Sequence, residues 1–233
     1  ETVTSNSGQK AALKRPLDFL VVADHSENLG LAQGLEASNP ELLKSSLGQE
    51  LHDMLKAGKG REAFYLLVQW MAKGSEALVS NDAYLTSVWQ MNNTVAERYN
   101  NPGTFTSLIG YEWTSQPSGG NLHRVVIFRD DKRMTDKILP FSAFDSEDVE
   151  DLWNFMAAYE QQTGGRVLAI PHNGNLSSGT MFLPRHQKSG MSIDADYARM
   201  RQRFEPLMEV TQAKGTGETH PLLSPEDEFA DFN

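Results

Sequence analysis

The segment that most constrains the fold is an apolar run at residues 19–23 that ends directly at Asp24 and His25. The run contains β-branched Val21 and Val22 and does not alternate apolar with polar residues, a pattern typical of a strand buried on both faces. Such strands belong to parallel sheets covered by helices. In α/β folds functional groups lie just beyond the carboxyl ends of the strands, so Asp24 and His25 stand where a metal-binding or catalytic pair is expected.

The remainder of the chain alternates between helical and strand patterns. Apolar residues recur at helical spacing within residues 39–100, and the run Asn100-Asn101-Pro102-Gly103 ends that region. We predict helices at 61–73, 82–99, about 146–163 and 193–204, and strands at 105–113, 122–128, 166–170 and 206–211. This alternation indicates an α/β barrel or an open α/β sheet. We expect a single domain over residues 1–233, with 39–100 as a helical insertion after the first strand.

The strands predicted at 105–113 and 122–128 are joined by only eight residues, 114–121. A parallel crossover needs about a dozen residues or more, so the two strands should be antiparallel neighbours. The end of the first strand then lies beside the start of the second. Glu112, near the end of the first, should therefore lie close to His123, at the start of the second.

Five candidate metal ligands converge on one edge of this predicted sheet: Asp24, His25, Glu112, His123 and His172. Each alone has a structural alternative, such as a helix cap, a turn or a backbone hydrogen bond, but their shared location favours a site. Imidazole and carboxylate ligands suit zinc, manganese or iron, and the chain has no cysteine to offer thiolates. Two or more such ions could activate a water molecule for hydrolysis.

Composition limits the partners of the chain. The net charge of −10 argues against binding to a phosphate backbone, although a metal ion could reverse the local sign for a small anionic substrate. No apolar run approaches the ~20 residues of a membrane span. The lack of cysteine suits the cytoplasm and the periplasm equally, and oligomeric state is not indicated. The chain begins with Glu1 rather than Met, so we expect a trimmed N-terminus in a longer protein.

At the candidate ligands the sequence resembles the PHP (polymerase and histidinol phosphatase) superfamily, and within it a large bacterial branch of PHP-like proteins described only as a domain of unknown function. The segments that carry the resemblance are Val22-Ala23-Asp24-His25-Ser26-Glu27, Gly110-Tyr111-Glu112-Trp113-Thr114, Asn121-Leu122-His123-Arg124, Ile170-Pro171-His172-Asn173 and Glu209-Val210-Thr211-Gln212.

The resemblance implies a distorted (β/α) barrel of about seven strands, with two or three divalent metal ions at the carboxyl edge of the strands. It makes Asp24, His25, His123 and His172 metal ligands and Glu112 a bridging or near-bridging carboxylate. Catalysis would fall to Asp24, His25, Glu112 and His172. The implied activity is that of a phosphoesterase, in which a metal-activated water attacks a small, anionic substrate.

Two motifs of the superfamily have no counterpart. No His-x-His precedes His25, and Asp231 is followed only by Phe232 and Asn233 rather than by an Asp-x-His motif. The resemblance therefore implies a fragment whose barrel and metal site are incomplete at both ends, with weak metal binding and low activity. Two alternatives stay open: a metallohydrolase acting on a carboxylic ester, an amide or a sulfate ester, and a non-catalytic module that binds a ligand or a metal.

Overall fold

The computed structural model describes residues 2–5, 7–71, 78, 81–212, 215, 216, 222 and 226. The helices are α1 (Leu31–Glu36), α2 (Ser46–Lys56), α3 (Gly60–Met71), α4 (Asp82–Tyr99), α5 (Lys132–Thr135), α6 (Val149–Thr163) and α7 (Ala195–Phe204), with short 3-10 helices η1 (Leu42–Lys44), η2 (Pro117–Gly119) and η3 (Gly174–Leu176). The strands are β1 (Thr2–Thr4), β2 (Lys10–Ala12), β3 (Phe19–Val21), β4 (Thr106–Trp113), β5 (Arg124–Phe128), β6 (Val167–Pro171), β7 (Thr211–Gln212) and β8 (Gly215–Thr216).

The central sheet has four strands in the order β3-β4-β5-β6. β3 runs parallel to β4, whereas β5 is antiparallel to both β4 and β6. The antiparallel pairing predicted from the short connection is confirmed, with Trp113 opposite Arg124. Arg124 also lies opposite Pro171, so the end of β4, the start of β5 and the end of β6 meet at one edge of the sheet.

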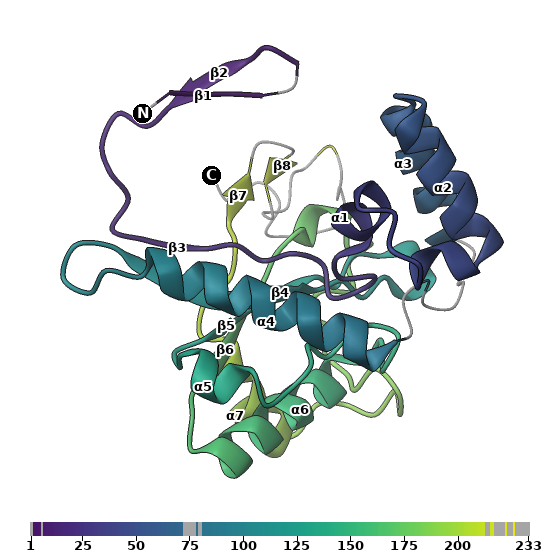
Figure 1. The fold of residues 1–233 in the computed structure, drawn as a ribbon. Coiled ribbons are helices and arrows are strands. Elements are labelled where there is room, and N and C mark those ends of the chain that lie inside the picture. The colour runs from purple at the N-terminus through teal and green to yellow at the C-terminus, as the bar shows by residue number, and fades with distance from the viewer. Residues whose placement is uncertain are drawn as a thin grey trace.

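The main core is aromatic and lies between the sheet and the helices α4, α6 and α7 (Figure 1). Its largest fully buried side chains include Trp89, Trp113, Trp153, Tyr111 and Phe128. Helix α6 begins where the side chain of Asp148 accepts a hydrogen bond from the backbone N–H of Glu150, and it ends at Gly164, whose φ of 72° suits glycine. These caps fix the helix that covers the sheet beside β6.

Close packing of the strands requires a glycine at position 110. A Cβ atom there would lie 2.6 Å from the backbone oxygen of Val126 and 2.6 Å from a methyl group of Val21. Such contacts are too short for any side chain, so Gly110 allows β3 and β5 to approach β4 on both sides. Glu112 lies two residues farther along β4, so its position relative to β3 and β5 depends on this close approach.

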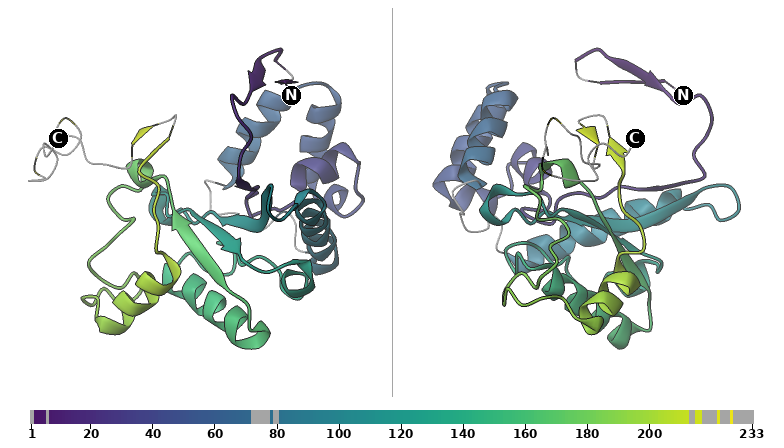
Figure 2. Two further views of the ribbon diagram at one scale, coloured as in Figure 1. Left: turned by 90° about the vertical axis from the view of Figure 1, so that its left-hand side faces the viewer. Right: turned by 180° about the vertical axis from the view of Figure 1, so that it is seen from behind.

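A second hydrophobic cluster lies between α1, η1, α2 and α3. Its buried residues are Leu31, Leu35, Leu42, Leu51 and Ala63. Figure 2 shows α2 and α3 standing apart from the sheet on the same side as the β1–β2 hairpin. The helix predicted at 82–99 is α4 and the one at 61–73 corresponds to α3, although residues 72 and 73 lie outside the described residues. The assignment of 39–100 as an insertion stays a prediction.

Burial of the first strand is the clearest error of the sequence analysis. β3 forms within the predicted run and is parallel to its neighbour, but Phe19 is 66% exposed and Leu20 and Val22 are exposed as well. Among the described residues β3 pairs with β4 alone, because it lies at the edge of the sheet. The apolar composition of the run is that of a buried strand, but β3 packs mainly against β4 and stays in contact with solvent. The other edge strand, β6, is buried because α6 and α7 cover it.

The strand predicted at 206–211 is also wrong in extent. Only Thr211 falls in a strand, β7, which pairs with β8 outside the central sheet. The backbone N–H of Glu209 donates to the oxygen of Pro171 at the end of β6, but residues 206–210 form no ladder. Leu207, Met208 and Val210 are exposed, so the apolar pattern here reflects surface residues rather than a buried strand.

The overall architecture is mixed α/β, as predicted. In the part of the chain that the structure describes, the four strands form an open sheet with edges at β3 and β6 rather than a closed barrel (Figures 1 and 2). None of the helices in these residues is long and apolar enough to cross a membrane.

Candidate metal centre

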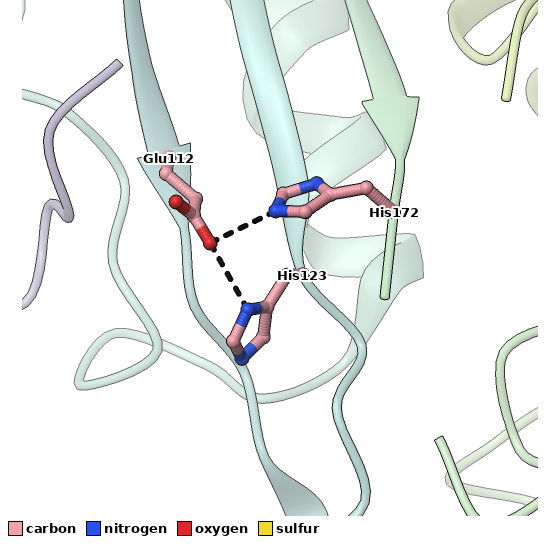
Figure 3. Close-up of side chains that lie close together, drawn as sticks. All are labelled: Glu112, His123 and His172. Carbon is pink, nitrogen blue, oxygen red and sulfur yellow. Dashed lines mark hydrogen bonds and ion pairs between the residues drawn. The ribbon is translucent and has the colours of Figure 1, made fainter. Parts of the chain in front are cut away.

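Three side chains converge at the edge of the sheet where β4, β5 and β6 meet: Glu112, His123 and His172 (Figure 3). Glu112 Oε1 lies 3.0 Å from His123 Nδ1 and 3.1 Å from His172 Nε2. One ligand atom from each residue falls within 4.8 Å of the others. The adjacency of Glu112 and His123 that the short connection predicts is present in the structure.

The strand geometry explains how these side chains reach one another. Side chains alternate between the two faces of a strand, so Tyr111 and Trp113 enter the core while Glu112 points to the opposite face. His123 lies directly before β5 and His172 directly after β6, and the backbone N–H of His172 donates to the oxygen of His123 at 3.1 Å. The pairing of β5 with β6 therefore places the two imidazoles next to each other, where both contact Oε1 of Glu112 (Figure 3).

The environment of Glu112 holds its carboxyl in the charged form. Its side chain is 13% exposed. Burial raises the pKa of Glu112, but hydrogen bonds with His123 and His172 and the charges of His25 and His172 lower it more, from 4.5 to about 2. A carboxylate that stays ionised among imidazoles is the donor arrangement that binds a divalent cation.

His25 lies beside this cluster at the other oxygen of Glu112. Its Nδ1 atom is 3.8 Å from Glu112 Oε2 and 2.5 Å from the hydroxyl of Thr114. The backbone brings the two segments together, because Glu112 N–H donates to the oxygen of Asp24 and Ser26 N–H donates to the oxygen of Glu112, both at 2.8 Å. The imidazole of His25 is 59% exposed, in contrast to that of His123 at 7%.

Asp24 is the candidate whose placement differs most from the expectation. It is exposed, and it contacts the centre through its backbone oxygen, which accepts from the backbone N–H of Glu112. The cluster within 4.8 Å contains Glu112, His123 and His172 but neither Asp24 nor His25. The metal-binding and catalytic roles assigned to the five residues from the sequence stay predictions.

Sequence reasoning missed the buried residue that joins the His25 segment to the rest of the site. Glu27 is 6% exposed, and its carboxylate accepts hydrogen bonds from the backbone N–H groups of Thr114 and Ala143. The contact with Ala143 is 2.6 Å long. Glu27 thus fixes the loop after β3 against the end of β4. Its position two residues after His25 was the available signal.

It also missed the polar residues around His123. The amide of Asn173 contacts Nδ1 of His123 at 2.9 Å, and the amide of Gln116 contacts Nε2 at 3.1 Å. Asn173 is buried and has a left-handed backbone with φ of 63°, a conformation that asparagine adopts more readily than most residues. No spacing pattern marks such residues in a sequence, although Asn173 directly follows His172.

The donor set fits a divalent metal ion. Ligand atoms about 2.0–2.2 Å from one tetrahedral zinc ion lie about 3.4 Å apart, close to the 3.0 and 3.1 Å contacts of Glu112 Oε1. Two imidazoles with one carboxylate also suit manganese and iron. The cluster could therefore bind a metal ion, and its chemistry does not choose among these metals.

Comparison with curated proteins gives no match, and comparison with solved structures gives none. A family model does match, over residues 1–233, and its description is "Protein of unknown function (DUF3604)". Because the match covers the whole printed sequence, the chain belongs to this family.

Proposed function

We propose that this protein is a metal-dependent hydrolase of PHP type that acts on phosphate esters, with Glu112, His123 and His172 as ligands of a divalent ion. The observation that carries the proposal is the convergence of one ionised carboxylate and two imidazoles from three separate segments. His25, next to the second oxygen of Glu112, offers a further ligand.

The residues of the chain would divide the work as follows. Glu112 and the two histidines would hold the ion, which would supply positive charge to polarise a phosphoryl oxygen and to activate water. Thr114 would orient His25 through its hydrogen bond to Nδ1. The other ring nitrogen, Nε2, would then be the ligand atom of this half-exposed imidazole. Zinc, manganese and iron are the candidate metals, in a complete centre of two or three ions, and the substrate would be a small anion.

Metal binding is the first test. Zn²⁺ or Mn²⁺ should bind to chelator-treated protein in calorimetry, and His123→Ala or Glu112→Gln should weaken affinity by more than the 10–100-fold typical of lost supporting contacts. His186→Ala is the matched control, because His186 pairs with Glu150 outside the cluster. Equal effects of His123→Ala and His186→Ala would contradict the proposed site.

Activity is the second test. The intact protein should hydrolyse aryl phosphate monoesters or diesters in the presence of added Mn²⁺ or Zn²⁺, and Glu112→Gln should abolish that activity. Turnover of a carboxylic, amide or sulfate substrate without turnover of phosphate esters would keep the metal centre and reject the substrate class. Metal binding without any turnover would reject the hydrolase and favour a binding module.

A further inference from the structure

A line of polar side chains connects Glu209 to the buried imidazole of His123. Glu209 Oε2 accepts a hydrogen bond from Gln212 Nε2 at 2.8 Å, and the same nitrogen of Gln212 donates to Asn173 Oδ1 at 2.6 Å. Asn173 Nδ2 then contacts His123 Nδ1 at 2.9 Å. The amide nitrogen of Gln116 contacts the other ring nitrogen, His123 Nε2, at 3.1 Å. Glu209 also accepts from the backbone N–H of Asn173.

The direction of each hydrogen bond in this line follows from its first member. An ionised carboxylate can only accept, so Gln212 must turn its NH₂ group toward Glu209. That NH₂ group has two hydrogens, and the second points to Asn173, which must therefore present its oxygen to Gln212. Asn173 is then left with its own NH₂ group facing His123 Nδ1.

An NH₂ group facing Nδ1 requires a lone pair on that atom. A neutral imidazole carries one hydrogen, so the hydrogen must sit on Nε2. Nε2–H then needs an acceptor, which Gln116 supplies once its amide presents oxygen to the ring. Gln116 is exposed and its amide can turn over, since the two ends of an amide have almost the same shape.

The opposite tautomer, with hydrogen on Nδ1 donated to Glu112, creates a conflict that cannot be removed. Asn173 would have to turn over, which would set its NH₂ group against that of Gln212. Turning Gln212 as well would set its oxygen 2.8 Å from the carboxylate of Glu209, which has no donor to offer. Each reorientation moves the unfavourable contact to the next pair of side chains, and the last such pair includes Glu209, which cannot donate.

We propose that Glu209 is a positioning residue that, through Gln212 and Asn173, fixes neutral His123 in the tautomer with a bare Nδ1. This inference rests on the proposed metal centre and deepens it. The bare Nδ1 lies 3.0 Å from Glu112 Oε1, so two acceptor atoms lie side by side without a hydrogen between them, and a cation would interact with both. A metal ion would take the Nδ1 lone pair from Asn173. A ring that carries hydrogen on both nitrogens would instead donate Nδ1–H to Glu112.

The tautomer can be measured without any metal. In chelator-treated protein labelled with ¹⁵N at histidine, at a pH where the imidazoles are neutral, long-range ¹⁵N–¹H spectra distinguish a bare from a protonated Nδ1. The signals of His123 are assigned by their loss in His123→Gln. We expect a bare Nδ1 and a protonated Nε2. A protonated Nδ1 in the neutral ring would overturn the proposal.

Two variants test the line itself. The Gln212→Glu variant places a second acceptor against both Glu209 and Asn173. The tautomer of His123 with a bare Nδ1 should then no longer be the only one populated, and Zn²⁺ affinity should fall about 10–100-fold. An added negative charge by itself would strengthen cation binding. The control variant Gln33→Glu, at an exposed position outside the line, measures the effect of such a charge alone. Glu209→Gln can still present an oxygen to Gln212, so it should keep both the tautomer and the affinity.

The outcomes separate this inference from the proposed function. A bare Nδ1 in a protein that does not bind Zn²⁺ would support the positioning role and reject the metal centre. Zn²⁺ binding that Gln212→Glu leaves unchanged, together with an unchanged tautomer, would keep the metal centre and reject the role of Glu209.

Discussion

Two phenylalanines in the same sheet have opposite environments. Phe128 on β5 is fully buried, with its ring against those of Trp89, Tyr111 and Tyr159, whereas Phe19 on β3 is 66% exposed. β5 has a strand on each side, while β3 in the described residues has only β4. The other edge strand, β6, is buried all the same, because α6 and α7 pack against it. Burial of a strand is thus set by the strands and helices that cover it, and its composition shows only that it tolerates burial.

The same difference separates the functional parts of the molecule. The metal-centre edge, where β4, β5 and β6 meet, is built from strands that other strands and helices support. His25 enters from the β3 side and has a far more exposed imidazole than His123. Three candidate ligands with largely buried side chains, Glu112, His123 and His172, therefore lie beside a fourth candidate, His25, whose imidazole is exposed.

The largest expected effect is on core packing. Phe128→Ala should lower the free energy of unfolding by about 3–5 kcal/mol, because it removes a large side chain from a filled aromatic core. Phe19→Ala, the matched control on β3, should lower it by less than about 1 kcal/mol. Urea denaturation followed by tryptophan fluorescence measures both. Similar losses would show that β3 is covered in solution and would remove the contrast between the strands.

An ion-pair comparison gives the next effect. Arg124 at the start of β5 and Glu205 at the end of α7 pair at 3.0 Å, with both side chains only 2% exposed. Glu205→Gln leaves the guanidinium buried without its counter-charge and should cost about 3 kcal/mol of stability. Asp18→Asn breaks the exposed Arg15–Asp18 pair next to β3 and should cost less than about 0.5 kcal/mol. Thermal unfolding at equal ionic strength compares them, and equal costs would contradict the burial assigned to Glu205.

The smallest of the three effects concerns pH at the candidate metal centre. The pKa of Glu112 is lowered to about 2 in the folded protein, below its usual 4.5, so its ionisation stabilises the fold above about pH 4.5. That contribution should be lost as pH falls from 4.5 toward 2, and it amounts to roughly 2–3 kcal/mol in the metal-free protein. Denaturation of chelator-treated protein across this range measures the loss.

Glu112→Gln provides the control for this prediction. The variant lacks the titrating carboxyl, so its stability should change less between pH 4.5 and 2 than that of the wild type. An identical pH profile for the two proteins would show that other carboxyl groups dominate acid unfolding.

Local patterns predicted the elements that short-range rules determine. The helix at 82–99 is α4, and the eight-residue connection was sufficient to place Glu112 beside His123. The exposure of β3 could not be predicted, because it depends on which strands and helices pack against the strand and not on its own residues. The contacts of Asn173 and Gln116 with His123 escaped prediction for a similar reason, since amide orientation follows from tertiary neighbours and leaves no periodic signal.

The order of strands has a consequence for when the ligand cluster can exist during folding. Glu112 and His172 are 60 residues apart in the chain, and their contact requires β5 to be paired with both β4 and β6. Contacts of such large sequence separation close a long loop, so we expect them to form after the local helices and the β4–β5 hairpin. The unfolded chain holds no preformed cluster, so an ion that binds there would stabilise the completed β4-β5-β6 sheet and slow its unfolding rather than guide the first steps of folding.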